Sequence, residues 1–387
     1  MTPHKFLQKK FLSLERGIGG WKNFLSVKRR RLEKILDFDG LKRDTIRAEV
    51  FDMKKRKLRA LEVSAVGMGC MGFSHGYGAC PPESESIRLM RAAYEDYGCT
   101  LFDTAEVYAA YENEILVGKA LKPIRDKIVL CTKFMPEMFL PGQEIPEGKT
   151  SRRGLRNAVE NSLKRLQTDY IDLYYEHRVP PNRDVAEVAE WMGELIKEGK
   201  ILAWGVSEAT PEQIRRAHSV TPLTAVQSEY SIMERKVEAE VLPLCRELNI
   251  GFVAFSPMAG GFLSGKYSGQ SKFEGDDVRR VITRYSKENM DANQALLDLL
   301  KKFAAQKNST PAQISLAWMM CKNDFVVPIP GMRRDERLKE NFGAADVVLT
   351  AEELNELEAA LAKIKIYGDR KDSDIQKLGT VKTVATH

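Results

Sequence analysis

The sequence predicts an α/β domain in which eight parallel strands close into a (β/α)8 barrel. Eight short apolar runs follow one another after Met53, and helical patterns separate them. No GxGxxG turn follows the first run, as the alternative fold, a doubly wound open sheet, would require. The glycine cluster Gly67–Gly72 has the wrong spacing for that turn. A chain of 387 residues suits one barrel plus an added segment.

The elements follow in a regular order. Two extended pieces, Lys57–Leu61 and Glu62–Ala65, are interpreted as a small hairpin that caps the barrel floor. The expected strands are Val66–Met68, Thr100–Phe102, Ile128–Cys131, Ile171–Tyr174, Leu202–Gly205, Ala225–Gln227, Gly251–Phe255 and Val326–Pro328. The expected helices are Glu83–Tyr97, Glu112–Leu121, Ser151–Leu166, Val185–Glu198, Pro211–Ala217, Val237–Leu248, a pair within Asn293–Cys321, Arg334–Phe342 and Ala351–Ile364. Thr210-Pro211 and Thr310-Pro311 each place an N-cap hydroxyl before a proline at the first helical position.

The basic charge of the chain belongs to its first 52 residues. They hold 13 Lys and Arg against 7 Asp and Glu, which accounts for the whole net charge of +6. We therefore divide the chain into a basic extension, residues 1–52, and a barrel domain, residues 53–387. Met53 is itself a possible start, so we expect the extension to be peripheral. The run Lys28–Arg31 could contact nucleic acid or an anionic membrane, although such a run is more typical of a solvated segment.

Composition excludes several classes of protein. No stretch reaches 18 apolar residues, and the amino end lacks the apolar run and cleavage site of a secretory signal. The six cysteines form no CxxC pair and no regular spacing. They are typical of reduced, mostly buried thiols, so we expect a cytoplasmic protein with no metal site and no membrane partner.

Polar side chains follow three neighbouring strands where each strand ends. Asp103 follows the second strand, Lys133 the third and His177 the fourth, and Tyr108 lies on the loop after the second. The active site of a (β/α)8 barrel lies at the carboxyl ends of its strands. Each residue alone has a structural interpretation, as a turn cap, a loop aromatic, a solvated lysine or a satisfied histidine. Together, their position on consecutive strand ends predicts a catalytic site.

These residue types suit the reduction of a carbonyl group, which needs a hydride on carbon and a proton on oxygen. Tyr108 is the candidate acid, although a free phenol has a pKa of about 10. We expect the Lys133 ammonium to lower that pKa and Asp103 to hold the ammonium in place. His177 would orient and polarise the carbonyl oxygen through a hydrogen bond.

The sequence resembles the aldo-keto reductase family, and specifically its NADP-dependent, bacterial-type general members. The resemblance runs from about Lys55 to Ile364. The motifs that carry it, in order, are VGMGCMGFS from Val66, LFDTAEVYAAYENE from Leu101, VLCTKF from Val129, SLKRLQTDYIDLYYEHR from Ser162, IKEGKILAWGVSE from Ile196, QSEYS from Gln227, FSPMAGGFLSGKY from Phe255 and PIPGMRRDERLKENFGA from Pro328. The resemblance implies a (β/α)8 barrel that uses NADPH, a small carbonyl substrate, no nucleic-acid partner, and an Asp-Tyr-Lys-His tetrad at the four residues above.

The resemblance also implies a cofactor site. Ser207, Glu208 and Gln227 would hold the nicotinamide carboxamide, and Tyr230 would stack on the nicotinamide ring. The remaining cofactor residues would be Gly69, Cys70 and Met71 after the first strand; Ser256, Pro257, Met258, Gly260, Leu263, Gly265 and Lys266 over the pyrophosphate; and Gly331, Met332, Arg333, Arg337, Glu340 and Asn341 at the adenosine end. Arg333 and Arg337 are expected on one helix face, where two guanidinium groups suit a 2′-phosphate.

Two positions depart from the pattern of the family that the sequence resembles. Glu208 stands where Asn is commoner, and a carboxylate cannot donate to the carboxamide oxygen. Ala109-Ala110 follow the tyrosine where Gly is frequent.

The alternative function to an enzyme is a cofactor-binding regulatory subunit, such as the β subunit of a potassium channel. Substrate choice would depend on side chains of unknown direction: Phe73, His75, Tyr111, Phe134 and Met135.

Overall fold

The computed structural model describes residues 53–136, 151–180, 183–371 and 375. The predicted basic extension, residues 1–52, lies outside the described residues. Eight parallel strands form one sheet in which neighbours follow chain order. They are β3 (Met68–Gly69), β4 (Leu101–Asp103), β5 (Val129–Phe134), β6 (Ile171–Glu176), β7 (Ile201–Ser207), β8 (Ala225–Glu229), β9 (Gly251–Phe255) and β10 (Val326–Pro328).

The sheet closes because its first strand pairs with its last. The Gly67 amide donates to the Pro328 carbonyl at 2.9 Å, and the Gly69 amide donates to the Pro330 carbonyl at 3.2 Å. A Cβ on Gly69 would lie 2.7 Å from the Ile329 carbonyl oxygen, so only glycine allows this close approach. The predicted (β/α)8 barrel is confirmed, since a doubly wound open sheet leaves its outer strands apart.

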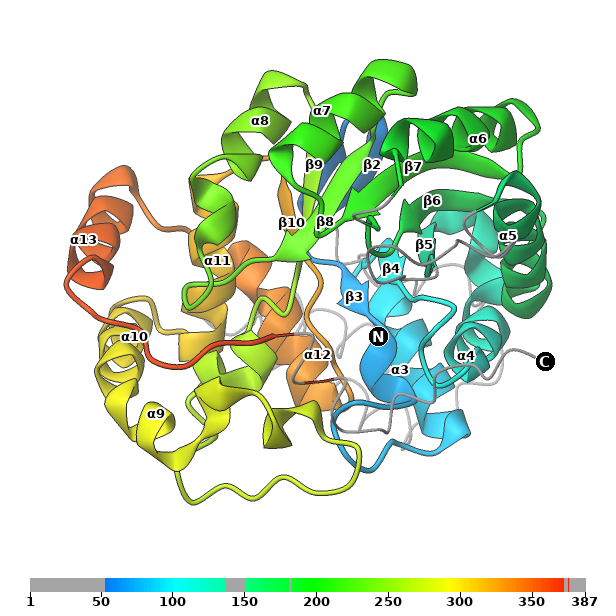
Figure 1. The fold of residues 1–387 in the computed structure, drawn as a ribbon. Helices are drawn as coiled ribbons and strands as arrows, with labels where there is room; N and C mark the ends of the chain where they lie inside the picture. Colours follow the sequence, from blue (N-terminus) through cyan, green and yellow to red (C-terminus); the bar gives the residue numbers. More distant parts are fainter. Residues whose placement is uncertain (1–52, 137–150, 181–182, 372–374, 376–387) are drawn as a thin grey trace, which may run out of the picture. The chain divides into compact units, whose positions relative to one another are not determined.

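Helices surround the strands in Figure 1, which looks along the barrel. Their bounds are α3 (Glu83–Glu95), α4 (Glu112–Leu121), α5 (Arg152–Leu166), α6 (Val185–Lys197), α7 (Pro211–Val220), α8 (Val241–Glu247), α9 (Lys287–Ala292), α10 (Gln294–Gln306), α11 (Pro311–Lys322), α12 (Asp335–Phe342) and α13 (Ala351–Leu361). Thr210 and Thr310 accept hydrogen bonds from the amides of Gln213 and Gln313, so both predicted helix caps are confirmed.

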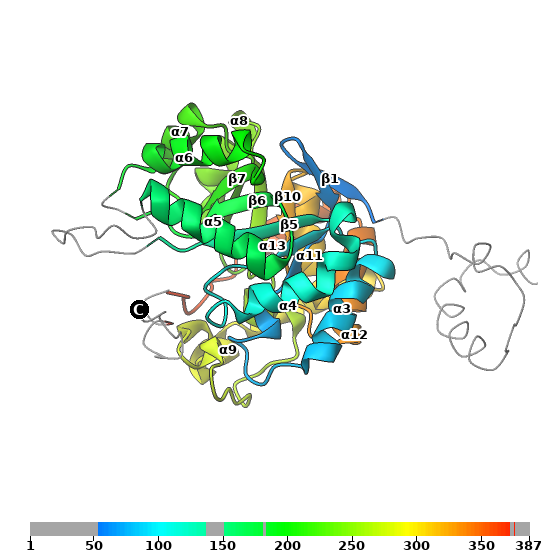
Figure 2. The same cartoon turned by 90° about the vertical axis from the view of Figure 1, so that its right-hand side faces the viewer.

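A hairpin closes the barrel floor, as predicted, but its turn at Arg59 and Ala60 falls within the first predicted strand, Lys57–Leu61. Strands β1 (Lys55–Leu58) and β2 (Leu61–Ser64) pair antiparallel. The side chains of Leu58 and Val63 are fully buried and pack with the inward-facing side chains of the barrel. A Cβ on Gly251 would lie 2.5 Å from Leu58, so the hairpin contacts the start of β9 directly. In the side view of Figure 2, the hairpin (blue) lies at the right-hand end of the barrel.

Four strands extend two or three residues past their predicted ends, toward the rim. The predictions end β5 at Cys131, β6 at Tyr174, β7 at Gly205 and β8 at Gln227, whereas these strands end at Phe134, Glu176, Ser207 and Glu229. Polar residues such as Lys133 interrupt the apolar runs but still pair within the sheet, because they lie on the inside of the barrel rim. Lys133 is therefore held by a strand and not by a loop.

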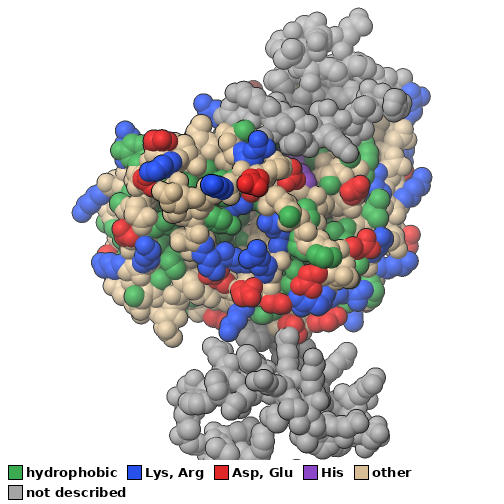
Figure 3. Space-filling model, turned by 90° about the horizontal axis from the view of Figure 1, so that it is seen from below, with side chains coloured by type: hydrophobic (Ala, Val, Ile, Leu, Met, Phe, Trp, Pro, Cys, Tyr) green, Lys and Arg blue, Asp and Glu red, His purple; other side chains and the backbone are tan. Residues whose placement is uncertain are grey.

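The described surface carries both signs of charge. On the face seen in Figure 3, Lys and Arg side chains are interspersed with Asp and Glu side chains. Among the described residues, no helix is long and apolar enough to cross a membrane.

Candidate active site

The four predicted catalytic residues meet at one end of the barrel. Asp103 ends β4, Lys133 is the last residue but one of β5, and His177 directly follows β6. The Lys133 Nζ lies 2.5 Å from Asp103 Oδ1 and donates to the Thr104 carbonyl at 2.7 Å. Gln227 Nε2 donates to Asp103 Oδ2 at 2.8 Å. The Asp103 carboxylate thus has a partner on each oxygen, and the ion pair it forms is fully enclosed.

Tyr108 lies against this ion pair. The Lys133 Nζ is 5.3 Å from the centroid of the Tyr108 ring. The His177 ring contacts the phenol edge-on, with centroids 5.8 Å apart, and the His75 ring lies 5.4 Å away. The phenol therefore stands between two imidazoles and an ammonium.

The protonation states differ in part from the expectation. Burial raises the pKa of Tyr108 above its ordinary value, although Lys133 opposes that rise. The Lys133 ammonium acts in the expected direction, but the removal of water from the phenolate outweighs it, so the pKa of Tyr108 does not fall. Burial disfavours the Lys133 ammonium, but its neighbours, with Asp103 first among them, together outweigh burial and raise the pKa of Lys133. Burial, followed by the charges of Lys133 and Arg178, holds the pKa of His177 well below its ordinary value, and its Nδ1 has no hydrogen-bond partner among the described residues.

The backbone that follows Tyr108 is strained. Ala109, Ala110 and Tyr111 have φ values of 51°, 49° and 78°, all in the left-handed region. Residues with a Cβ adopt this conformation at a cost of roughly 1–2 kcal/mol each, which glycine would avoid. The strain is local to the loop that presents the phenol.

The residues expected at the nicotinamide carboxamide lie on the same rim. The Gln227 side chain contacts Asp103, and the Ser207 hydroxyl lies 3.3 Å from Arg178 Nη1. Glu208 is exposed, has a φ of 55°, and accepts a hydrogen bond from the Glu229 amide at 2.8 Å. Asn tolerates the left-handed region better than Glu, so the backbone at this position would suit Asn.

The segment after β9 is built from left-handed residues and glycines. Ser256, Ala259, Gly260 and Gly265 have φ values of 48°, 48°, 68° and 69°. Met258 and Leu263 are buried in the core between sheet and helices, as are Cys70 and Met332. A ligand at the rim could meet only the backbone of these four residues. Pro257 lies within the same segment.

The adenosine-end residues form a charged cluster, with one correction. The predicted helix at Arg334 begins at Asp335, so Arg333 precedes the helix and does not share a face with Arg337. Arg333 instead donates to the carbonyls of Ala79 and Tyr77, both at 2.9 Å. Arg337 pairs with Glu340 at 2.5 Å, and Lys266 lies 3.5 Å from the same carboxylate. Asn341 is buried beside them, Gly331 is exposed and Met71 half-buried.

The structure does not bring Tyr230 to the rim. Its fully buried ring packs against Trp318 and Phe252, and its hydroxyl donates to Glu238 at 2.7 Å. Of the possible pocket residues, Phe73 and Phe134 are buried in the outer core, and Tyr111 lies under the guanidinium of Arg165. His75 is the one whose ring contacts Tyr108.

Sequence reasoning missed several charged residues of this end of the barrel. Arg178 donates to the His177 carbonyl at 2.6 Å. Glu229 pairs with the buried Arg284 at 2.9 Å and lies 3.5 Å from Arg370. The alternation of β8 was the available signal for Glu229, since it lies two residues after Gln227. Among the described residues, no group of three His, Cys, Asp or Glu side chains could hold a metal ion.

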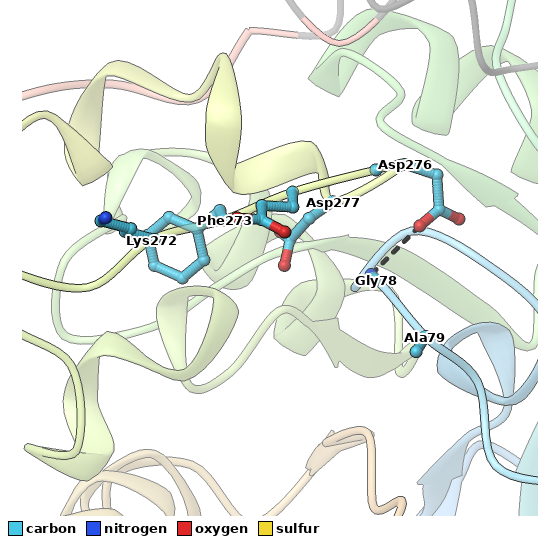
Figure 4. A pocket seen from close by; sticks show the side chains of 8 residues that line it. Gly78, Ala79, Lys272, Phe273, Asp276 and Asp277 are labelled. Carbon is cyan, nitrogen blue, oxygen red and sulfur yellow. Dashed lines mark hydrogen bonds between the residues drawn. The ribbon is translucent and has the colours of Figure 1, made fainter.

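A surface pocket of about 480 Å³ lies where the segment after β3 meets the segment after β9. The Asp276 carboxylate accepts hydrogen bonds from the amides of Gly76 and Gly78, at 2.8 and 3.1 Å. Figure 4 shows the second of these contacts. Asp276 therefore ties together two segments that border the rim.

Comparison with known proteins identifies proteins that are similar to this chain in sequence and in structure. The profile described as "Aldo/keto reductase family" matches residues 65–362. "Probable aldo-keto reductase 1" of Glycine max is 39% identical over 319 residues, which cover 81% of this chain and 89% of the relative. A glycerol dehydrogenase from Gluconobacter oxydans has a similar structure, with a TM-score of 0.71, 26% identity, and coverage of 81% of this chain and 96% of that one. An aldo/keto reductase from Klebsiella pneumoniae, solved with NADP and acetate, has a TM-score of 0.61, 29% identity, and coverage of 82% and 99%.

Proposed function

The chain belongs to the aldo/keto reductase family, and on that premise we propose that it reduces a small aldehyde or ketone with a hydride from NADPH, using Tyr108 as the general acid. One observation carries the proposal. The Tyr108 phenol, the His177 imidazole and an enclosed Lys133–Asp103 pair converge on one point of the barrel rim. This is the set of groups that carbonyl reduction needs.

The residues present fit an NADPH molecule. Relatives of this fold include one solved with NADP. Lys266, Arg333 and Arg337 bring cations to one end of the expected site, where a 2′-phosphate would need them. A Cβ at Gly331 would meet only one atom, 4.0 Å away, so the backbone there leaves room for a ligand. Ser207 and Gln227 would hold the nicotinamide carboxamide, and NADPH when bound supplies the hydride for the carbonyl carbon.

The proton would come from Tyr108. Burial keeps its pKa above the ordinary value, so the phenol holds its proton at neutral pH. Negative charge grows on the carbonyl oxygen as the hydride arrives, and the phenol donates its proton to that oxygen. The Lys133 ammonium then stabilises the phenolate, and Asp103 keeps the ammonium in place. His177 stays neutral and orients the same oxygen by a hydrogen bond.

The test is NADPH oxidation against a panel of aldehydes, ketones and quinones, for the full chain and for Tyr108→Phe. The variant keeps the ring volume but loses the acid. We expect turnover to fall by at least about 10²-fold while NADPH binding is unchanged. Tyr94→Phe on α3, remote from the rim, is the matched control and should behave as the parent. Near-normal turnover by Tyr108→Phe would exclude Tyr108 as the acid, and NADPH binding without turnover by the parent would favour a regulatory subunit.

A further inference from the structure

The left-handed turn after Tyr108 needs an external support. Ala109, Ala110 and Tyr111 adopt it against the preference of residues with a Cβ. Strained backbone persists only where the surrounding structure fixes it. Backbone hydrogen bonds close the turn, since the Tyr111 amide donates to Glu106 and the Asn113 amide to Tyr108. These bonds fix the shape of the turn but not its position against the barrel.

One guanidinium outside the barrel contacts the chain before, within and after this turn. Arg165 of α5 has its Cζ 4.5 Å from the centroid of the Tyr111 ring. Its Nε lies 2.6 Å from Glu114 Oε2, and its Nη2 lies 3.9 Å from Glu106 Oε2. Glu106 precedes Tyr108 by two residues and Glu114 follows it by six. A Cβ on Gly118 would lie 2.5 Å from the Arg165 carbonyl oxygen, so α4 and α5 are in close contact here.

The same carboxylates reach the strand that carries Lys133. The Thr132 hydroxyl donates to Glu114 Oε1 at 2.6 Å, and the Met135 amide donates to Glu106 Oε1 at 2.8 Å. Thr132 and Met135 flank Lys133 in the sequence. Glu106 and Glu114 are 1% and 0% exposed, so these contacts form in a region from which water is largely excluded. Arg165 is thereby linked to the backbone on both sides of the proposed acid and on both sides of its lysine.

We propose that Arg165 is a positioning residue that sets the place of Tyr108 relative to Lys133 and does not itself contact the substrate. This inference rests on the proposed function, because it assigns Arg165 a role only through the acid. Buried, paired charges hold their geometry well, and a displacement of about 1 Å at a reacting group can cost about 10²-fold in rate. The alternative is that the Arg165–Glu114 pair serves stability alone.

The experiment compares Arg165→Met, Arg165→Lys and a control, Arg156→Met. Arg156 lies on the same helix, its side chain is 39% exposed, and it pairs with Glu198 at 2.6 Å. Each change is made in the parent and in Tyr108→Phe. NADPH oxidation is followed with para-nitrobenzaldehyde, and NADPH affinity is measured by fluorescence titration. We expect Arg165→Met to lower kcat about 10-fold to 100-fold with NADPH affinity unchanged, Arg165→Lys to keep part of the rate, and Arg156→Met to have no effect.

The Tyr108→Phe background separates positioning from a general effect. If Arg165 acts through the phenol, Arg165→Met lowers kcat no further once the phenol is gone. A parent-like kcat in Arg165→Met, or an equal fall in both backgrounds, overturns the inference while the proposed function stands. Full turnover by Tyr108→Phe alone would overturn both. If Arg165→Met does not fold, Tyr111→Leu replaces it, since it removes the ring under the guanidinium and leaves the ion pair. A parent-like kcat for Tyr111→Leu would then overturn the inference.

Discussion

The same strands line both the floor and the rim of the barrel, and the inward-facing residues of the two levels lie two positions apart in the sequence. Near the floor, the inward-facing side chains pack with the β1–β2 hairpin, which we call the hairpin plug. They include Leu101, Cys131 and Ala225. Two residues further along the same strands come Asp103, Lys133 and Gln227, which form the polar site. The interior near the floor is lined by apolar side chains, whereas the interior at the rim contains buried charges that are paired with one another. The two-residue period of a strand therefore separates stability from chemistry within one interior.

Backbone strain occurs at both ends of the barrel. The described non-glycine residues with positive φ at the rim include Ala109, Ala110, Tyr111, Glu208 and Ser256. Near the floor, Asn249 has a positive φ that Asn tolerates, and Arg59 and Gln167 have φ values of 52° and 55°. At the rim, three of these residues are consecutive and directly follow Tyr108, so the strain there is concentrated beside the site. Floor substitutions should lower stability, and rim substitutions should lower binding or rate.

The largest expected effect is at the rim. Replacing both Arg333 and Arg337 by Ala should weaken NADPH far more than NADH, by roughly 1.5–3 kcal/mol for each lost charge-assisted contact. The affinity of both cofactors is measured by fluorescence titration. Arg334→Ala changes an exposed neighbour and serves as control. Equal losses for the two cofactors would remove the 2′-phosphate assignment and show that Arg333 serves only its carbonyl partners.

A substitution at the floor should lower the free energy of unfolding and leave the activity of the folded protein unchanged. Leu58→Ala leaves a cavity in the plug, so the free energy of unfolding in urea should fall by about 2–5 kcal/mol. The kcat/KM of the folded protein should not change, because the plug lies at the other end of the barrel. Leu202→Ala, at a side chain that is 50% exposed, should change stability little. A loss of kcat/KM without a loss of stability would break the division between floor and rim.

Glu176 is a buried carboxyl near the rim that has no role in the proposed reaction. Its substitution therefore measures how much a buried charge there lowers the free energy of unfolding. Burial raises the pKa of this carboxyl to about 8, and within the described part of the chain its Oε2 has no hydrogen-bond partner. A folded-state pKa above the unfolded one means that stability is greatest at low pH and falls as pH rises from about 4.5 through about 8. Glu176→Gln should therefore be neutral near pH 5 and stabilise the protein by about 1–3 kcal/mol near pH 9. Urea unfolding at both pH values measures this, and a gain that is equal at both would contradict it.

The smallest expected effect is the removal of residues 1–52, which we propose to be peripheral. A chain that begins at Met53 keeps the hairpin plug and the whole described site. Its melting temperature and kcat/KM should match those of the full chain. Melting more than about 5 °C lower would show that the extension contributes to the stability of the barrel, and lost activity at full stability would assign it a role at the rim.

Much of the fold could be predicted because its periodicity is local. The bounds of α4 agree with the prediction, and the tetrad follows from the rule that sites form where barrel strands end. The direction of Tyr230 could not be predicted, because the expected strand ended at Gln227, and alternation through Glu229 turns Tyr230 away from the interior. The pKa of Tyr108 depends on how much water its neighbours exclude, and the contacts of Arg165 depend on how two helices pack. Neither is visible in a linear sequence.

The seam between the first and last strands has a consequence for how the protein forms. Gly67 and Pro328, which hydrogen-bond across it, are about 260 residues apart in the sequence. Contacts of such long range form slowly, because the intervening chain must be ordered first. During synthesis, the edge of β3 stays without its partner until the residues of β10 have emerged. A ribosome that stalls before that point would release a chain with an open sheet edge, which is prone to pair with other chains.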